Sequence, residues 1–149
     1  MARPKSYIPK GSDLLTEKFI NCIMKRGKKS TARKIFADAM EVIKTRTKEN
    51  PMDVFNKALI NVTPLVEVRP KRVGGAVYQV PVEVSAKRQT SLSIRWILDA
   101  ARSRKGMPMA EKLAHELLDA STEQGAAMKK KEDVVRMAQA NRAFAHLAK

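Results

Sequence analysis

The chain has 149 residues, of which 30 are Lys or Arg and 15 are Asp or Glu, and its formal net charge is +15. This length suits one domain with a modest core, and an apolar share of 44% excludes wholesale disorder. Such an excess of positive charge opposes compaction unless a polyanion neutralises it. Nucleic acid is therefore the expected partner, and an anionic membrane surface is the second candidate.

Cysteine content and hydropathy indicate the cellular compartment in which the protein is expected. Cys22 is the only cysteine, so no internal disulfide forms, and its apolar neighbours Phe19, Ile20 and Ile23 predict a buried, inert thiol. No run approaches the roughly 20 apolar residues of a membrane span, and no hydrophobic signal region follows the basic N-terminus. We expect a cytoplasmic protein in a reducing compartment, with no membrane partner.

The first segment, residues 1–11, is expected to be an extended basic arm, because it combines three cations with two prolines and a glycine. Ser12 then offers an N-cap, and apolar residues follow at helical spacing. Gly27 is expected to end this first helix.

Two further helices are predicted before the pattern changes. The second begins near Ser30 and runs to about Lys48, because apolar residues recur on one face throughout this stretch. In the third, Asn50 is the expected N-cap and Pro51 occupies the first helical position, where its missing amide hydrogen costs nothing.

Residues 65–84 predict a β-hairpin, because apolar and polar residues alternate with period two on both sides of Gly74-Gly75. Pro70 and Pro81 exclude a central position in a larger sheet. An isolated two-stranded ribbon is only marginally stable in water. We therefore expect the hairpin to project from the helices and to lean on a partner.

The register of this hairpin depends on its loop length. A two-residue Gly-Gly turn would set Val66 opposite Glu83 and would mix apolar and charged side chains on one face. A three-residue loop instead pairs Val66 with Val82 and Val68 with Val80, which keeps the valines together. The second register is the one that we predict.

Helical periodicity returns after the hairpin. A fourth helix is predicted at about 87–104, a fifth is opened by Pro108 and ended by Gly125, and a sixth runs over about 130–146. Residues 1–149 thus read as a mainly α single domain of six helices, with one protruding two-stranded β-hairpin and a basic N-terminal arm.

Patterns for catalysis or metal binding are missing from the sequence. Gly-Lys-Lys-Ser-Thr at 27–31 is similar to the end of a phosphate-binding P-loop, but the earlier glycine of that motif is replaced by Cys22 and no strand precedes it. His115 and His146 are far apart and have no ligand cluster around them. We expect no enzyme activity, cofactor, metal or small-molecule substrate.

Positive charge is concentrated in three stretches. Six cations bracket the turn before the second helix, whose N-terminus adds to the attraction for phosphate. The second stretch spans 69–105, and the third is Lys129–Lys131. Because Phe19, Phe36, Phe55 and Trp96 fall on predicted core faces, we expect recognition of RNA shape and backbone more than of splayed bases.

Several stretches, in the same order over nearly the whole chain, resemble the bacterial-type family of the seventh protein of the small ribosomal subunit. They are Lys28-Lys29-Ser30-Thr31-Ala32, Arg72-Val73-Gly74-Gly75, Tyr78-Gln79-Val80-Pro81-Val82-Glu83-Val84, Arg95-Trp96, Lys129-Lys130 with Glu132-Asp133-Val134, Arg136-Met137-Ala138, and Ala140-Asn141 with Ala143-Phe144-Ala145-His146. The hairpin segment and the last helix are the most specific.

This resemblance implies a six-helix fold and primary binding to the 3′ major domain of small-subunit rRNA, where the family nucleates assembly of the head. It also implies a hairpin near the exit-site tRNA and the mRNA path, beside a platform protein and among other head proteins. Cytoplasmic and organellar ribosomes both stay open. The alternative class, a basic helical DNA-binding regulator, should show a helix-turn-helix pair and a symmetric dimer face.

The charge pattern and the resemblance together give two sets of candidate residues. The predicted rRNA-binding residues are Arg3, Lys5, Lys10, Lys25, Arg26, Lys28, Lys29, Arg33, Lys34, Arg88, Arg95 and Arg102. The residues predicted to face tRNA and mRNA are Lys71, Arg72, Gly74, Gly75, Lys129 and Lys130.

Overall fold

The computed structural model describes residues 8–148, so most of the predicted arm at 1–11 lies outside the described residues. In its described part the Ser12 amide donates to the Pro9 carbonyl at 3.2 Å, which makes a turn. The elements that follow are α1 (Leu14–Ile23), α2 (Lys29–Thr47), α3 (Pro51–Val62), β1 (Val66–Val73), β2 (Ala76–Glu83), α4 (Ala86–Ser103), α5 (Met109–Ser121), α6 (Gly125–Ala140) and the 3₁₀ helix η1 (Arg142–Ala148).

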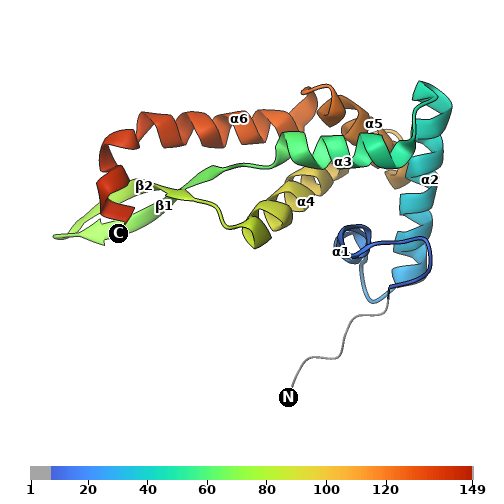
Figure 1. Ribbon diagram of the computed structural model, residues 1–149, viewed down its shortest axis with the longest axis horizontal. Helices are drawn as coiled ribbons and strands as arrows, with labels where there is room; N and C mark the ends of the chain where they lie inside the picture. Colours follow the sequence, from blue (N-terminus) through green and yellow to red (C-terminus); the bar gives the residue numbers. More distant parts are fainter. Residues whose placement is uncertain (1–7, 149) are drawn as a thin grey trace, which may run out of the picture.

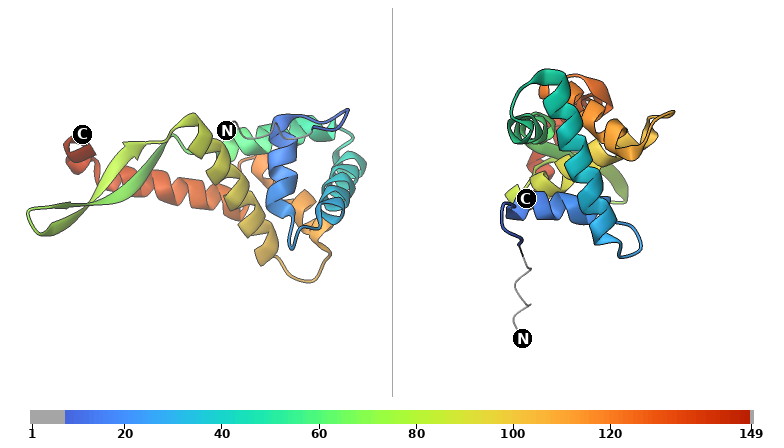
Figure 2. Two further views of the ribbon diagram at one scale, coloured as in Figure 1. Left: turned by 90° about the horizontal axis from the view of Figure 1, so that it is seen from below. Right: turned by 90° about the vertical axis from the view of Figure 1, so that its right-hand side faces the viewer.

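The molecule is elongated, with a helical body at one end and the hairpin at the other (Figure 1). Helices α1 to α5 form the body, while α6 runs from the body out over the hairpin and η1 bends down across it. Two further views give the same arrangement (Figure 2). This confirms the predicted mainly α fold with one protruding antiparallel hairpin.

Three aromatic rings join α1, α2 and α3. Phe19 and Phe55 are fully buried, Phe36 is 7% exposed, and their ring centroids lie 5.0 to 5.9 Å apart with edge-on or tilted geometry. Aromatic pairs prefer this geometry because the positive ring edge meets the negative face. The helical spacing of these residues had predicted their burial, and the structure confirms it.

Helix α5 lies at the centre of the body and contacts α2, α3, α4 and α6. Leu113, Ala114, Leu117 and Ala120 are fully buried along it. These residues repeat at steps of three and four, so they form one continuous apolar face. The body therefore depends on α5 for most of its helix packing.

The connection between α5 and α6 differs from the one that the sequence predicted. Gly125 does not end the fifth helix, which stops at Ser121, but is the first residue of α6. It has φ +90°, and a Cβ there would lie 3.0 Å from both Asp119 Cβ and Glu116 Oε1. Glu116 Oε1 also accepts a 3.0 Å hydrogen bond from the Ala127 amide, so it caps the start of α6. Glycine thus permits a close helix junction.

Other predicted boundaries also differ from the structure. The N-cap of α1 is Asp13, whose carboxylate accepts from the Thr16 amide at 2.7 Å, and α1 already ends at Ile23. The predicted last helix at 130–146 is wrong at both ends, because α6 begins at Gly125 and ends at Ala140. Asn141 caps its C-terminal end by donating its side-chain amide to the Met137 carbonyl. The thiol of Cys22, predicted to be buried, belongs to an exposed residue.

The hairpin adopts the register that the sequence analysis rejected. Gly74 and Gly75, with φ +59° and +85°, form a two-residue turn, and Val66 pairs with Glu83. Both residues of such a turn need positive φ, which suits the Gly-Gly pair. The prediction of a three-residue loop was therefore wrong.

The packed face of the hairpin carries both apolar and charged side chains, and one of the charged side chains is buried. Directly opposite residues share a face, so Glu67 lies with Val82, and Val80 with Arg69. Glu67 is only 7% exposed and Val80 only 1%. The fold does not need all the valines on one face, because two arginines pair with the buried Glu67 and make its burial on the packed face favourable.

Candidate nucleic-acid interface

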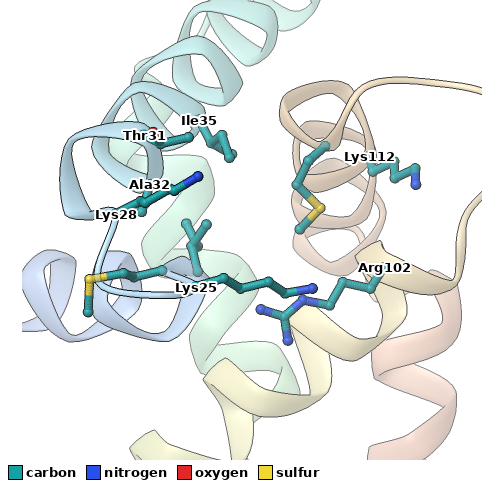
Figure 3. Close-up of a pocket in the computed structure, with 10 residues that line it drawn as sticks. Lys25, Lys28, Thr31, Ala32, Ile35, Arg102 and Lys112 are labelled. Atoms are coloured by element: carbon teal, nitrogen blue, oxygen red, sulfur yellow. The ribbon is translucent and has the colours of Figure 1, made fainter.

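A cavity of about 450 Å³ opens between the α1–α2 turn and the neighbouring ends of α4 and α5 (Figure 3). Four cations line it: Lys25, Lys28, Arg102 and Lys112. The remaining lining residues are uncharged, and most are apolar: Ile23, Met24, Thr31, Ala32, Ile35 and Met109. A hollow lined by four positive charges and no carboxylate favours an anionic occupant.

Local backbone geometry brings these cations together. Arg26 and Gly27 both have positive φ (56° and 74°), and they turn the chain sharply between α1 and α2. Lys25 and Arg102 extend toward the same opening from opposite sides (Figure 3). The Arg102 guanidinium also donates to the Cys22 carbonyl at 3.1 Å, which ties the end of α4 to the end of α1.

The start of α2 lies beside this cavity. The first turn of α2 contains no acidic residue, and the N-cap, Lys28, makes no capping hydrogen bond with its side chain. The first amides of a helix point outward and carry the positive end of the helix dipole. They therefore add to the positive potential that Lys25 and Lys28 create.

Two of the predicted cations are held by a buried carboxylate. Glu17 is 3% exposed, and its two oxygens accept from both ends of the Arg33 guanidinium at 2.8 and 2.9 Å. Ser12 donates to it at 2.8 Å, and the Lys29 ammonium lies 3.3 Å away. The hydrogen bond from Arg33 is the main reason that the pKa of Glu17 falls to about 2. Arg33 and Lys29 thus join α1 to α2.

A second buried carboxylate holds the base of the hairpin. Glu67 accepts from Arg88 Nε at 2.8 Å and from Arg69 Nε at 3.0 Å. Burial alone would raise the pKa of Glu67, but these hydrogen bonds and the two positive charges lower it. Arg88, predicted to bind rRNA, therefore also connects α4 to β1.

Arg104 completes a third such cluster inside the body. Its guanidinium donates to Glu116 at 3.0 Å and also to Asp119. Burial opposes the charge on Arg104, but the two carboxylates outweigh burial and raise its pKa. This arginine belongs to the second basic stretch of the sequence, and the structure assigns it to packing between α4 and α5.

The other predicted rRNA-binding residues are spread over the body. Arg3 and Lys5 lie outside the described residues. Lys10, Arg26, Lys34 and Arg95 are exposed and do not line the cavity. Of the predicted set, the structure thus gathers Lys25, Lys28 and Arg102 at the cavity.

Lys112 was missed by the sequence analysis. It comes from the first turns of α5, where an isolated lysine gives no local signal. Only the packing of α5 beside α2 brings it to the cavity that Lys28 lines. The position of Lys112 at the cavity is therefore set by tertiary packing and not by a local sequence pattern.

The residues predicted to face tRNA and mRNA fall into two separate places. Lys71, Arg72, Gly74 and Gly75 are exposed at the outer part of the hairpin. Lys129 and Lys130 are exposed near the start of α6, at the body end (Figure 1). A helix of 16 residues is about 24 Å long, so the structure does not bring the two groups together.

Within residues 8–148, no three His, Cys, Asp or Glu side chains gather closely enough to hold a metal ion. None of the helices in that range is long and apolar enough to cross a membrane. The cationic cavity is the arrangement in the described chain with the clearest binding chemistry.

Comparison with known proteins gives one consistent result. The sequence profile described as Ribosomal protein S7p/S5e matches residues 2–142. The chain is 59% identical over 135 residues to the small ribosomal subunit protein uS7 of Thermosipho africanus, covering 91% of this chain and 87% of that protein. It is 58% identical over 137 residues to uS7 of Elusimicrobium minutum, covering 92% and 86%. The chain belongs to the S7p/S5e family of ribosomal proteins.

Proposed function

We propose that the protein is a structural component of the small ribosomal subunit and binds its rRNA through the cationic cavity and the exposed cations around it. The observation that carries this proposal is that Lys25, Lys28, Arg102 and Lys112, from three separate parts of the chain, line one cavity. Like charges repel, and gathering four of them without a carboxylate in the lining costs folding energy. A polyanion that enters the hollow offsets that cost.

Phosphate contacts explain how such a surface binds RNA. Lysine and arginine side chains neutralise backbone phosphates and release counterions, and this term fixes the position of the RNA without reading its sequence. The cavity lining also includes apolar side chains, among them Met24, Ile35 and Met109. The interface therefore recognises the shape and charge of folded RNA.

Membership of the family supports a more specific assignment. The bacterial relatives are named as small-subunit proteins, which makes the cytoplasmic ribosome the place of action that we infer. The proposed RNA target is the 3′ major domain of small-subunit rRNA, where binding would start assembly of the head. The hairpin would face the exit-site tRNA and the mRNA path, beside head and platform proteins. The DNA-binding alternative has no comparable support.

The experiment that tests rRNA binding reverses two charges at the cavity. Lys28→Glu with Lys112→Glu places carboxylates where phosphates should lie, so we expect at least about tenfold weaker binding to a head-domain rRNA fragment, roughly 1.4 kcal/mol. A filter-binding titration at fixed salt measures this effect. Circular dichroism should show unchanged helix content.

The matched control reverses two exposed cations elsewhere in the body. Lys44→Glu with Lys57→Glu changes the net charge by the same amount, but neither residue lines the cavity. We expect a loss of less than about threefold, from long-range attraction alone. Equal losses in both double variants would show that binding depends on net charge and not on the cavity.

A further inference from the structure

The hairpin has one face that is packed against the chain's own C-terminal region. In the observed register Lys71 lies directly opposite Tyr78, so both side chains are on the same face as the buried Val80. In the register predicted from the sequence, with a three-residue loop, Lys71 would lie opposite Val77, and Tyr78 would point to the other side. The two-residue Gly-Gly turn therefore decides which side chains can reach η1.

Both of these side chains contact η1. The rings of Tyr78 and Phe144 pack with centroids 5.1 Å apart, and both residues are half-buried. The Lys71 ammonium donates to the backbone carbonyl of Leu147. Carbonyl groups at the end of a helix lack intrahelical donors, so a lysine there is favourable. Figure 1 shows η1 bent down from α6 across the strands.

Apart from η1, the hairpin is held at its base by α4 and is packed against α6. Arg88 donates to Glu67, and Gln89 Nε2 donates to the Val84 carbonyl at 2.9 Å. A ribbon attached only at its base is free to pivot there, because two strands alone are marginally stable. A second attachment farther out, at Tyr78, fixes the direction of the ribbon.

We propose that η1 is a strap and that Phe144 is a positioning residue, which together hold the hairpin at one angle to the body. The exposed tip, with Arg72 on the face opposite Lys71, is then presented to RNA in one direction. The value of this orientation rests on the proposed function. The strap itself is a property of the free protein and can be tested without RNA.

Amide hydrogen exchange of the full chain tests the strap directly. In Phe144→Ala the amides of residues 69–80 should exchange about fivefold faster, since an aromatic pair is worth roughly 0.5–1.5 kcal/mol. Amides of α5 should keep the wild-type rate. Phe144→Tyr keeps the ring and should restore protection, and Ala143→Ser, at an exposed position on the same 3₁₀ helix, should have no effect.

Two results of that experiment would overturn the proposal. Wild-type exchange of the hairpin in Phe144→Ala would show that η1 does not hold it. Equal acceleration in the hairpin and in α5 would show a general loss of stability in place of positioning.

The orientation of the tip is tested in the RNA complex. An iron chelate attached at Val77→Cys, in a Cys22→Ser background, cleaves nearby RNA with hydroxyl radicals. The cleavage of a bound head-domain rRNA fragment should be confined to one region with Phe144 and spread over a wider region with Phe144→Ala. An unchanged pattern would contradict the strap. If the labelled protein that keeps Phe144 failed to bind RNA, this would instead count against the proposed function. Hydrogen exchange would still show whether η1 holds the hairpin.

Discussion

The helical body and the hairpin differ in what holds them together. In the body, α1, α2 and α3 meet through three buried aromatic rings, and α5 is buried along one whole face. In the hairpin, residues 69–77 are exposed, and the ribbon depends on contacts at its base, with α6 and with η1. The difference teaches that the body carries most of the stability of the domain, whereas the outer hairpin contributes little to the core.

One device is common to both regions. A buried glutamate pairs with two cations: Glu17 with Lys29 and Arg33 in the body, and Glu67 with Arg69 and Arg88 at the hairpin base. Each glutamate joins two elements. Of the four cations that they neutralise, Lys29, Arg33 and Arg88 are ones that the sequence predicts to bind rRNA. The positive charge of the chain is therefore divided between cations that support the fold and cations that remain at the surface.

The largest difference between the regions should appear when a core ring is removed. Phe55→Ala should lower the free energy of unfolding by about 3–5 kcal/mol, because Phe55 is fully buried and its loss leaves a cavity. Val77→Ala in the hairpin, at a residue 55% exposed, should change it by less than about 0.5 kcal/mol. Urea denaturation followed by circular dichroism measures both. Similar losses at the two positions would break the comparison.

Glu17→Gln should have the next largest effect, about 2 kcal/mol at pH 7, because it weakens hydrogen bonds to charged partners. The pKa of Glu17 is about 2 in the folded protein, below its ordinary value of 4.5. Unfolding then takes up a proton at acid pH, so the stabilisation is present above about pH 5 and is lost as the pH falls toward 2.

Denaturation curves at several pH values test this expectation for Glu17. The stability difference between the wild type and Glu17→Gln should shrink from pH 6 to pH 3. Glu41→Gln, at an exposed position on α2, is the control and should follow the wild type throughout. A pH-independent difference would mean that packing, and not charge, explains the effect of Glu17.

Glu67→Gln should have a smaller effect, about 1 kcal/mol, because its arginine partners are largely exposed to solvent. Its lowered pKa makes this contribution also disappear on acidification. Faster hydrogen exchange should be confined to the hairpin base. Glu83→Gln, exposed on the opposite face of the hairpin, is the control, and an equal effect there would contradict the role of Glu67.

Helix periodicity and turn residues predicted most of the fold. The cap at Asn50-Pro51, the burial of Trp96 and the hairpin at 65–84 all follow from local patterns and are confirmed. The hairpin register was not predictable in this way, because the buried charge of Glu67 is stabilised by Arg88, which is distant in sequence. The role of Gly125 likewise depends on the approach of Glu116 from α5.

The sequence predicted a set of cations for the candidate site, but it did not predict which of them lie together at the cavity. Runs of lysine and arginine identified Lys25, Lys28 and Arg102, but the same rule also selected Arg33 and Arg88, which are paired with buried carboxylates. Charge counting cannot separate these cases, because the pairing partner lies elsewhere in the chain. For the same reason it missed Lys112.

The most direct test of the central claim, that RNA affinity resides in the body and not in the hairpin, is the salt dependence of binding. With six or more phosphate contacts, log K against log salt should have a slope of about −5 for the wild type on a head-domain rRNA fragment. Lys28→Glu with Lys112→Glu should reduce that slope by about 2, while replacement of residues 70–79 by a short Gly-Ser link should change it by less than about 1. A hairpin replacement that loses most of the slope, beside a cavity variant that keeps it, would contradict the claim.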